Sequence, residues 1–383
     1  MYKKVVCILV LSLLMAVVSR AAGQDDASKV IATVKSQVAP DSRQAVFDVR
    51  VVEADNGALH AIGVVSDASA KDAIAAALSG TVDLSGVVVL PQNRWGHVRI
   101  PVACMRTKPG HAAEMATQAV MGTPLRILGV VDEDWWVQTP DGYIGYMPSS
   151  SMVEKSAEEM AQWRKANRLV VTAWDQVDVY STQKPSGPRD IVTDLVNGSI
   201  VEGSIAGKSK MIEVTLPDGR KGWIDRSFVT DISQWASQEF NPDTILNMAY
   251  SLHGTPYLWG GTSAKALDCS GLAKVSYFAN GIILMRDASQ QAKTGEIMAA
   301  ERWRELEAGD LLFFGNADTG RVTHVAIYDR DGNYLHSSGR VKVNSIDPAS
   351  EGYLTTPHLS SSRIKTRIGS VGITRVANHP WFF

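Results

Sequence analysis

Along the first quarter of the chain, the spacing of hydrophobic residues alternates between a helix-like and a strand-like pattern. Apolar residues recur every three to four positions over residues 29–38 and 68–78. Apolar and polar residues alternate over residues 45–52, and residues 87–90 form a short apolar run. The helical period predicts helices at the first two segments, and the other two patterns are typical of strands. We therefore expect a small α/β unit over residues 24–98, and we find no catalytic chemistry in it.

Two segments in the middle of the chain repeat each other. Residues 140–146 and 217–223 share the pattern Pro-Asp-Gly-x-x-Gly-aromatic at an offset of 77 residues. Asp-Gly favours a tight hairpin turn, and the second glycine allows the backbone to approach closely before the aromatic residue. Self-similarity at a fixed offset indicates duplicated modules. Because the strands between turns are short, we expect two small β-barrels, over residues 99–160 and 161–233.

The last third of the chain has longer helical and strand patterns. After a polar linker over residues 234–240, Asn241 and Pro242 have the residue types preferred at the N-cap and the first turn of a helix. Residues 322–328 and 333–338 have strand-like patterns and are separated by a turn that contains glycine, which predicts a β-hairpin.

The C-terminal end of this region is more polar. We expect a loop over residues 355–365 and the last strand over residues 368–376. Residues 240–383 therefore form, in this interpretation, a third domain that mixes helices and strands.

Composition and charge narrow the class of protein. The chain has 383 residues, of which 45 % are hydrophobic and 20 % charged, and its formal net charge is −2. These proportions are typical of a globular protein with several domains. Because there is no basic excess to attract a phosphate backbone, we expect no nucleic-acid partner.

The N-terminus predicts export. Lys3 and Lys4 precede an apolar run over residues 5–18, and small residues follow up to residue 23. This pattern predicts a signal peptide over residues 1–23 that is cleaved when the protein reaches the periplasm or the exterior. The run has about 14 residues where a bilayer span needs about 20, so we expect no membrane span in the mature chain.

Cysteine usage directs attention to one residue. Cys7 leaves with the signal peptide, and the sequence leaves open whether Cys104 and Cys269 pair. Neither lies in a Cys-x-x-Cys or His/Cys cluster, so we predict no metal site. Apolar residues at helical spacing follow Cys269, which places it at the N-terminus of a helix. There the helix dipole is expected to lower the pKa of the thiol and favour a nucleophilic thiolate.

The predicted hairpin supplies a base for this thiol. His324 lies on its first strand and His336 on its second. Because neighbouring antiparallel strands can bring the two rings together, one histidine can act on Cys269 while the other orients it.

Five motifs in this region follow the order seen in the NlpC/P60 cysteine peptidase family, which residues 242–383 resemble. The motifs are Tyr257-x-Trp259-Gly260-Gly261, Asp268-Cys269-Ser270-Gly271, Gly309-Asp310-Leu311-x-Phe313-Phe314, His324-Val325-Ala326-Ile327-Tyr328 and Tyr334-x-His336. The resemblance implies a papain-like core that hydrolyses cell-wall peptides without a cofactor. It assigns Cys269 as the nucleophile, His324 as general base and acid, and His336 as the orienting residue. Tyr257 becomes a phenol near the thiolate.

The repeated turns resemble those of bacterial SH3 domains. The expected fold class is therefore α+β, with a papain-like NlpC/P60 domain preceded by two SH3-like β-barrels and the small N-terminal α/β unit. This arrangement resembles the γ-D-glutamyl-L-diamino acid endopeptidases of the dipeptidyl-peptidase VI type. The resemblance implies a peptidoglycan-derived substrate, L-Ala-γ-D-Glu-diamino acid. Its free amino end would be held by Asp268, Ser270 and Ser289 and by an acid of the first SH3-like module.

The resemblance does not fix which residues of the first SH3-like module would hold the amino end of the substrate. A buried ammonium group needs a carboxylate partner, and Asp268 and Glu114 are the candidates. Tyr143 or Tyr146 would add a hydroxyl group, and we favour Tyr143 because Arg220 stands at its position in the second copy.

Two other functions remain open at this point. In one, the SH3-like modules bind the cell wall and the catalytic domain is idle, although the intact Cys269, His324 and His336 favour an active enzyme. In the other, the papain-like fold catalyses amidase or acyl-transfer chemistry through the same thioester.

Overall fold

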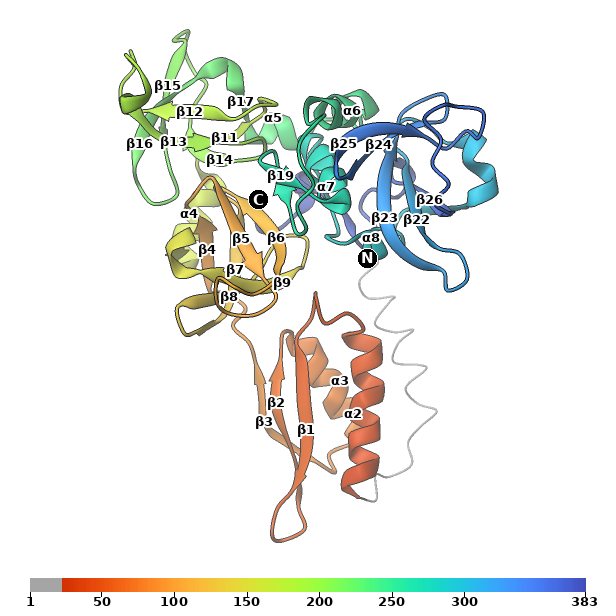
Figure 1. Cartoon of the computed structure of the whole chain (residues 1–383). Coiled ribbons are helices and arrows are strands. Elements are labelled where there is room, and N and C mark those ends of the chain that lie inside the picture. The colour runs from red at the N-terminus through yellow and green to blue at the C-terminus, as the bar shows by residue number, and fades with distance from the viewer. Residues whose placement is uncertain (1–22) are drawn as a thin grey trace. The chain divides into compact units, whose positions relative to one another are not determined.

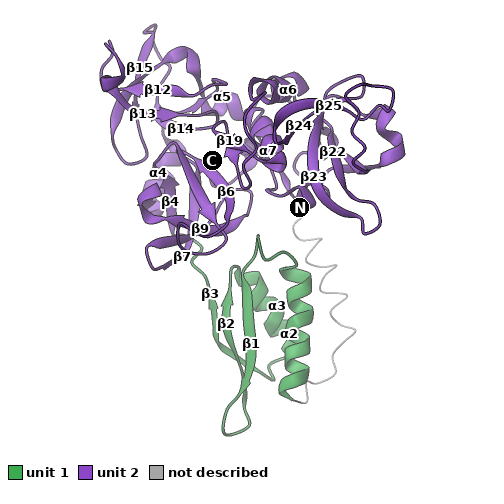
Figure 2. Cartoon of the chain, in the orientation of Figure 1, with its two compact units in different colours: residues 1–92 green, residues 93–383 purple. Residues whose placement is uncertain are grey.

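The computed structural model describes residues 23–383, which form two compact units that end and begin at Gln92 and Asn93 (Figure 2). The predicted signal peptide lies, apart from Gly23, outside the described residues. Within residues 23–383, every helix is too short or too polar to cross a bilayer.

The first unit is a three-stranded sheet with two helices. Its elements are α2 (Gln24–Val38), β1 (Phe47–Glu53), β2 (Leu59–Val65), α3 (Ala68–Leu78) and β3 (Asp83–Val89). β1 and β2 are antiparallel, and β2 and β3 are parallel because α3 forms the crossover between them. Ile31 and Val34 of α2 and Ile74 of α3 are buried in one core with the sheet. The predicted helices and strands of this unit are confirmed.

The second unit begins with two seven-stranded sheets. The first contains β4 (Trp95–Val98), β5 (Val102–Arg106), β6 (Met115–Val120), β7 (Pro124–Val131), β8 (Asp134–Gln138), β9 (Ile144–Pro148) and β10 (Met152–Lys155). The second contains β11 (Arg168–Val171), β12 (Val177–Tyr180), β13 (Ile191–Leu195), β14 (Ile200–Gly203), β15 (Met211–Thr215), β16 (Lys221–Asp225) and β17 (Val229–Asp231). We call them the first and the second barrel; α4 (Ala157–Lys165) connects them.

The two barrels share one strand order. The first runs β10-β4-β7-β8-β9-β5-β6, and the second, in the same direction, runs β17-β11-β14-β15-β16-β12-β13. The repeated turns occupy equivalent places, between β8 and β9 and between β15 and β16. Gly142 and Gly219 have φ angles of 86° and 87° in these turns, a left-handed conformation that favours glycine. The sequence repeat is therefore a repeat of structure.

The same aspartate of each turn contacts a neighbouring module. Asp141 forms an ion pair with Lys274 of the catalytic region, and the two side chains are only 5 % and 15 % exposed. Asp218 pairs with Arg99 of the first barrel at 3.2 Å, where the arginine is 42 % exposed. Burial alone would raise the pKa of Asp141, but Lys274 brings it below the ordinary value. The first turn is thus anchored by a buried pair and the second by a half-exposed one.

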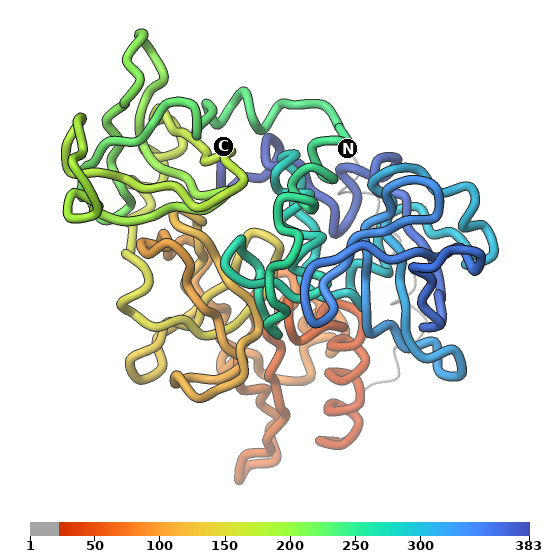
Figure 3. The backbone as a smooth tube through the Cα atoms, turned by 45° about the horizontal axis from the view of Figure 1, so that its top comes forward, coloured from red at the N-terminus to blue at the C-terminus, as the bar shows by residue number. Residues whose placement is uncertain are grey.

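The remaining chain builds a six-stranded sheet with helices on it. Helices and small pairings are α5 (Ile232–Ala236), α6 (Pro242–Ser251), β18 (Thr262–Ser263), β19 (Ala266–Leu267), α7 (Cys269–Ala279), β20 (Ile282–Leu284), α8 (Ala288–Gln291) and β27 (Ile373–Arg375). The sheet has the order β21 (Glu296–Ala299), β26 (His358–Arg363), β22 (Leu311–Asn316), β23 (Arg321–Tyr328), β24 (Asn333–Ser338) and β25 (Arg340–Ser345). Helix α7 lies between this sheet and the two barrels (Figures 1 and 3).

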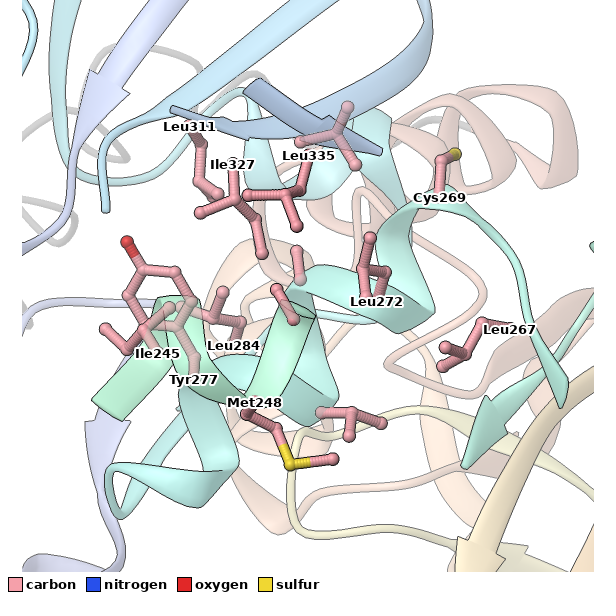
Figure 4. Packing of buried hydrophobic residues seen from close by; sticks show 14 of the residues in the cluster. Ile245, Met248, Leu267, Cys269, Leu272, Tyr277, Leu284, Leu311, Ile327 and Leu335 are labelled. Carbon is pink, nitrogen blue, oxygen red and sulfur yellow. The ribbon is translucent and has the colours of Figure 1, made fainter. Parts of the chain in front are cut away.

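The core of this region lies between α6, α7 and the sheet. Leu311, Ile327 and Leu335 of the sheet belong to one buried cluster with Met248 of α6 and Tyr277 of α7 (Figure 4). Since these side chains are almost fully removed from water, the cluster holds the start of α7 rigidly against the sheet.

Three local predictions for this region differ from the structure in part or in whole. Residues 355–365 were expected as a loop, but β26 pairs with both β21 and β22, and its serines Ser361 and Ser362 are buried. The first part of the predicted polar linker is the end of α5, whose Trp235 is buried. The last strand is only β27. In each case tertiary packing overrides a local pattern that lacks apolar alternation.

Candidate active site

Cys269 is the first residue of α7, as the sequence predicted. Asp268 caps the helix, since its Oδ1 accepts a hydrogen bond from the N–H of Gly271 at 2.7 Å and its Oδ2 accepts one from Gly260 at 3.0 Å. Residues 260 and 261 are glycines because a side chain at either would collide with nearby backbone. The Gly-Gly loop and the cap together fix the position of Cys269 at the start of the helix.

The resting thiol is protonated, contrary to the expected effect of the helix dipole. Cys269 is 8 % exposed, and burial raises the pKa of its thiol to about 11. The nearby Asp268 adds to the rise, whereas the backbone N–H groups of Val325 and Ser270 oppose it. Desolvation of a charge outweighs the helix end here, so a thiolate requires a base that takes the proton. Cys104 and Cys269 are both free, which answers the question of their pairing.

Three strands carry a chain of hydrogen bonds beside the thiol. Nε2 of His324 on β23 lies 2.8 Å from Nδ1 of His336 on β24, and Nε2 of His336 lies 2.9 Å from Oδ1 of Asn344 on β25. The amide Nδ2 of Asn344 donates to the carbonyl oxygen of Gly352 at 2.9 Å. The predicted hairpin thus brings the two histidines together, and Asn344 extends the chain in a way that the sequence analysis missed.

This chain determines the tautomer of both neutral rings. Because Asn344 uses Nδ2 for Gly352, its Oδ1 must accept from Nε2–H of His336. Nδ1 of His336 is then an acceptor, so Nε2 of His324 carries a proton and donates it. The lone pair of His324 is therefore at Nδ1, where it can act as a base.

Both histidines are neutral at rest. Burial lowers the pKa of His324 to about 4, and His336 and Lys342 contribute to the decrease. Burial also lowers the pKa of His336. Lys342 faces His336 across β24 and β25, so the surroundings disfavour a second positive charge. The raised pKa of the Cys269 thiol and the lowered pKa values of the two histidines favour the neutral thiol and imidazole over the thiolate and imidazolium.

A buried arginine ties the first barrel to the nucleophile helix. The guanidinium of Arg286 donates to both carboxylate oxygens of Asp268, at 3.1 and 2.5 Å, and to Oγ of Ser270 at 2.8 Å. Its Nε donates to Oγ1 of Thr117 on β6 at 2.8 Å. Arg286 is 1 % exposed, so this pairing is required to keep its charge in the interior. The charge of Asp268 is thereby matched within the protein, and its main contacts hold the start of α7.

The predicted residues of the first barrel contact the catalytic region at two points. Oε1 of Glu114 accepts a hydrogen bond from Nε1 of Trp259 at 2.8 Å. The hydroxyl of Tyr143 donates to Oδ2 of Asp287 at 3.3 Å. Asp287 lies 4.0 Å from Arg286 and is 27 % exposed. The sequence analysis missed Asp287, although a charged pair directly after an apolar run was a signal that could have found it.

The structure separates the two tyrosines that the sequence left open. Tyr143 is buried and reaches Asp287, whereas Tyr146 stacks on Trp136 of its own barrel with ring centroids 6.0 Å apart. Of the other predicted residues, Tyr257 lies near the thiol, and burial raises the pKa of its phenol to about 12 with Cys269 contributing. Ser289 lies on α8, which packs on β23, the strand of His324.

Among residues 23–383, no group of three or more His, Cys, Asp or Glu side chains is arranged to hold a metal ion.

Comparison with known proteins relates both parts of the site to described families. Residues 254–363 match the NlpC/P60 family, and residues 105–152 match the bacterial dipeptidyl-peptidase SH3 domain. A dipeptidyl-peptidase 6 of Lysinibacillus sphaericus is 28 % identical over 255 residues, which cover 64 % of this chain and 89 % of that protein. A γ-D-glutamyl-L-lysine dipeptidyl-peptidase of Bacillus cereus is 28 % identical over 242 residues, or 59 % of this chain and 68 % of that protein.

The fold is also similar to that of a solved structure. The crystal structure of an NlpC/P60 family protein from Bacillus cereus superposes with a TM-score of 0.60 at 22 % identity. The match covers 70 % of this chain and 99 % of that one, which shows a shared fold.

Proposed function

We infer that this chain, which carries an NlpC/P60 cysteine peptidase domain behind a bacterial dipeptidyl-peptidase SH3 domain, is an exported endopeptidase of peptidoglycan peptides. The proposed bond is that between γ-D-Glu and the diamino acid, in peptides with a free N-terminal L-Ala. The observation that carries the proposal is that the first barrel reaches the catalytic region with Tyr143, which binds Asp287 beside the helix of Cys269. The name of the 28 % identical Bacillus cereus relative supports the same substrate class, and the name of the Lysinibacillus sphaericus relative supports dipeptidyl-peptidase activity.

Catalysis begins with proton transfer in the neutral pair. Nδ1 of His324 takes the proton of the Cys269 thiol, and the thiolate attacks the carbonyl carbon of the scissile amide. Backbone N–H groups at the start of α7 are suited to stabilise the negative oxygen that develops. Collapse of this intermediate breaks the C–N bond, and the imidazolium of His324 returns the proton to the leaving amine.

Water completes the reaction. His324 removes a proton from water, hydroxide attacks the thioester, and the thiol is released with its proton restored. His336 and Asn344 act throughout by keeping the base at Nδ1 of His324.

The free amino end of the substrate is recognised by carboxylates at the edge of the first barrel. We assign the ammonium to Asp287 and Glu114 because their side chains are more exposed than that of Asp268, which is buried against Arg286. Ser270 and Ser289 supply hydroxyl groups, and Tyr143 orients Asp287. An ammonium group in such a partly closed site is bound only where negative charge balances it.

Incubation with L-Ala-γ-D-Glu-L-Lys and its N-acetylated form tests the proposal. Mass spectrometry should detect L-Ala-γ-D-Glu and free lysine, and acetylation should lower kcat/KM by about 100-fold, which corresponds to about 3 kcal/mol. Cys269→Ala should lose activity by about 1000-fold or more. Equal cleavage of the free and acetylated peptides would contradict the assigned specificity. Persistent activity of Cys269→Ala would contradict covalent catalysis, and products of acyl transfer would favour the alternative chemistry.

A further inference from the structure

A groove lies where the second barrel meets the catalytic region. It has a volume of about 270 Å³ and is lined by the loops after β11 and β13, by β17, by α5 and the residues after it, by the start of α6 and by the end of α7. Of the described residues that line it, none has an ionisable side chain; they contribute hydroxyl, amide and indole groups. No part of the proposed mechanism uses this groove.

One aromatic residue stands open to water at its rim. Trp174 is 55 % exposed, although a large indole ring is normally covered in a folded protein. Trp235 also lines the groove, but it is only 4 % exposed and donates its Nε1–H to the carbonyl oxygen of Ala279 at 3.1 Å. Trp174 therefore supplies the one open aromatic face of the groove.

A buried amide contributes a polar group at the wall. Asn197 is 9 % exposed, and its Nδ2 donates to the carbonyl oxygen of Ala173 at 3.1 Å. This bond fixes the amide plane and leaves Oδ1 as an acceptor. Gln234 and Gln238 also line the groove and add further amides, and Thr244 adds a hydroxyl group.

We propose that this groove binds a neutral saccharide. An ionic ligand would lose hydration without finding an opposite charge, and a purely apolar ligand would leave the wall amides without partners. A pyranose ring matches both features, since its hydroxyl groups exchange hydrogen bonds with amides while its C–H face lies against an aromatic ring. A proline-rich peptide fits less well, because grooves for such peptides are lined by several aromatic residues and this one has a single exposed ring.

The site is independent of the proposed peptidase activity. Trp174 belongs to the second barrel, whereas the catalytic groups lie on α7 and on β23–β25. Saccharide binding can therefore be measured on the full chain with Cys269→Ala, and hydrolysis of a soluble peptide reports separately on the catalytic region.

Calorimetric and NMR titration with tri-N-acetylchitotriose and with cellotriose tests the proposal. We expect saturable binding of at least one of them with a Kd of about 0.1–10 mM, the range of a single small site. Trp174→Ala should weaken it about tenfold or more, Trp174→Phe should retain part of it, and Gln234→Glu should weaken it by introducing a charge. Hydrolysis of the soluble peptide by the active enzyme should not change in any of these variants.

The matched control is Phe228→Ala. Phe228 is an aromatic residue of the same barrel that is 39 % exposed but does not line the groove, so its loss should leave binding unchanged. The proposal would be overturned by the absence of saturable binding of both trisaccharides, by equal affinity in the Trp174→Ala protein, or by stronger binding of decaproline than of either sugar.

Discussion

The two barrels have the same strand order and the same turn motif, yet only the first contacts Arg286, which pairs with Asp268 at the start of the nucleophile helix. Thr117 of the first barrel accepts a hydrogen bond from Arg286, and Tyr143 donates one to Asp287. In the second barrel the residue at the position of Tyr143 is Arg220, which pairs with Asp218 of its own turn at 2.9 Å. Duplication of the fold therefore did not duplicate its contacts. Core positions must keep their apolar pattern, whereas surface positions are free to diverge.

The two barrels also differ in how firmly they are attached to the catalytic region. The first uses the buried pair of Asp141 and Lys274, whereas the second contacts the catalytic region through Asp194 and Lys265, whose side chains are 20 % and 40 % exposed. Water screens the second contact and not the first. The first barrel is thus joined to the catalytic region by a buried ion pair, and the second by a pair that water reaches.

The largest expected effect comes from the repeated aspartates. Asp141→Ala leaves Lys274 buried without its partner and should lower the free energy of unfolding by about 3–5 kcal/mol. Asp218→Ala is the matched control; its arginine partners are 42 % and 41 % exposed, so water can solvate them and the loss should be about 1 kcal/mol or less. Urea unfolding measures both, and equal losses would contradict the difference in attachment.

The hydrogen-bonded chain of His324, His336 and Asn344 involves neither barrel, so a substitution in it gives a reference for the effects of the barrel variants. Asn344→Leu should lower kcat by about 10- to 100-fold, or about 1.4–2.8 kcal/mol, with little change in KM, because His336 no longer has an acceptor that fixes its tautomer. Asn344→Asp should retain more activity and shift the activity profile to higher pH, since a carboxylate raises the pKa of the neighbouring imidazole.

Nitrogen NMR of the histidines reports the tautomer directly. We expect an unprotonated Nδ1 in His324 of the wild-type protein and a mixture of tautomers in Asn344→Leu. Asn333→Leu, on the same strand as His336, serves as the control for a lost amide. An unchanged kcat in Asn344→Leu would exclude a positioning role.

Acid should destabilise the first barrel through its buried histidine, His97, and the second barrel has no such residue. Burial lowers the pKa of His97 on β4 to about 3, with Lys155 and Arg168 contributing, while the unfolded chain binds a proton near 6.5. The stabilisation is complete above pH 6.5 and is lost as the pH falls toward 3, by about 1–2 kcal/mol between pH 6.5 and 5. The second barrel, residues 161–233, contains no histidine.

Unfolding of His97→Leu across this pH range isolates the contribution. Because other buried histidines titrate in both proteins, the difference between variant and wild type reports on His97 alone. An identical pH dependence of the two proteins would refute the assignment.

The smallest expected effect tests the contact of the first barrel with the substrate site. Tyr143→Phe removes the hydrogen bond to Asp287 and should lower kcat/KM for the free-amine peptide by about 2- to 10-fold, the equivalent of about 0.5–1.5 kcal/mol. The acetylated peptide should be affected less. Arg220→Ala changes the equivalent position of the second barrel and should leave both rates unchanged; a similar loss there would remove the distinction between the barrels.

Several features of the site were predictable because they depend on neighbouring residues. The N-cap at Asp268, the helix after Cys269 and the hairpin of His324 and His336 are each encoded within a few positions. Arg286, Asp287 and Asn344 were missed. A lone arginine after the apolar residues 282–285 was a signal that a buried charge needs a partner, but nothing local names Asp268 or Thr117 as that partner.

The direction of the thiol pKa was a different kind of miss. A helix start lowers the pKa of a thiol, and this was read correctly from local pattern, but burial contributes more and raises it. Burial depends on which segments cover Cys269, including Val325 on β23, which lies more than fifty residues further along the chain.

The sequence by itself determined the order of modules, the repeat that makes two barrels, the place of Cys269 at a helix start and the hairpin that carries His324 and His336, since these follow from short-range periodicity, turn chemistry and motif spacing. Only the tertiary structure decided which barrel contacts Arg286 and Asp287, which carboxylate is paired with Arg286, and which ring nitrogen of His324 has the free lone pair. These depend on distances between segments far apart in the chain. Electrostatic and hydrogen-bond energies change over a few ångströms, a scale that no local pattern specifies.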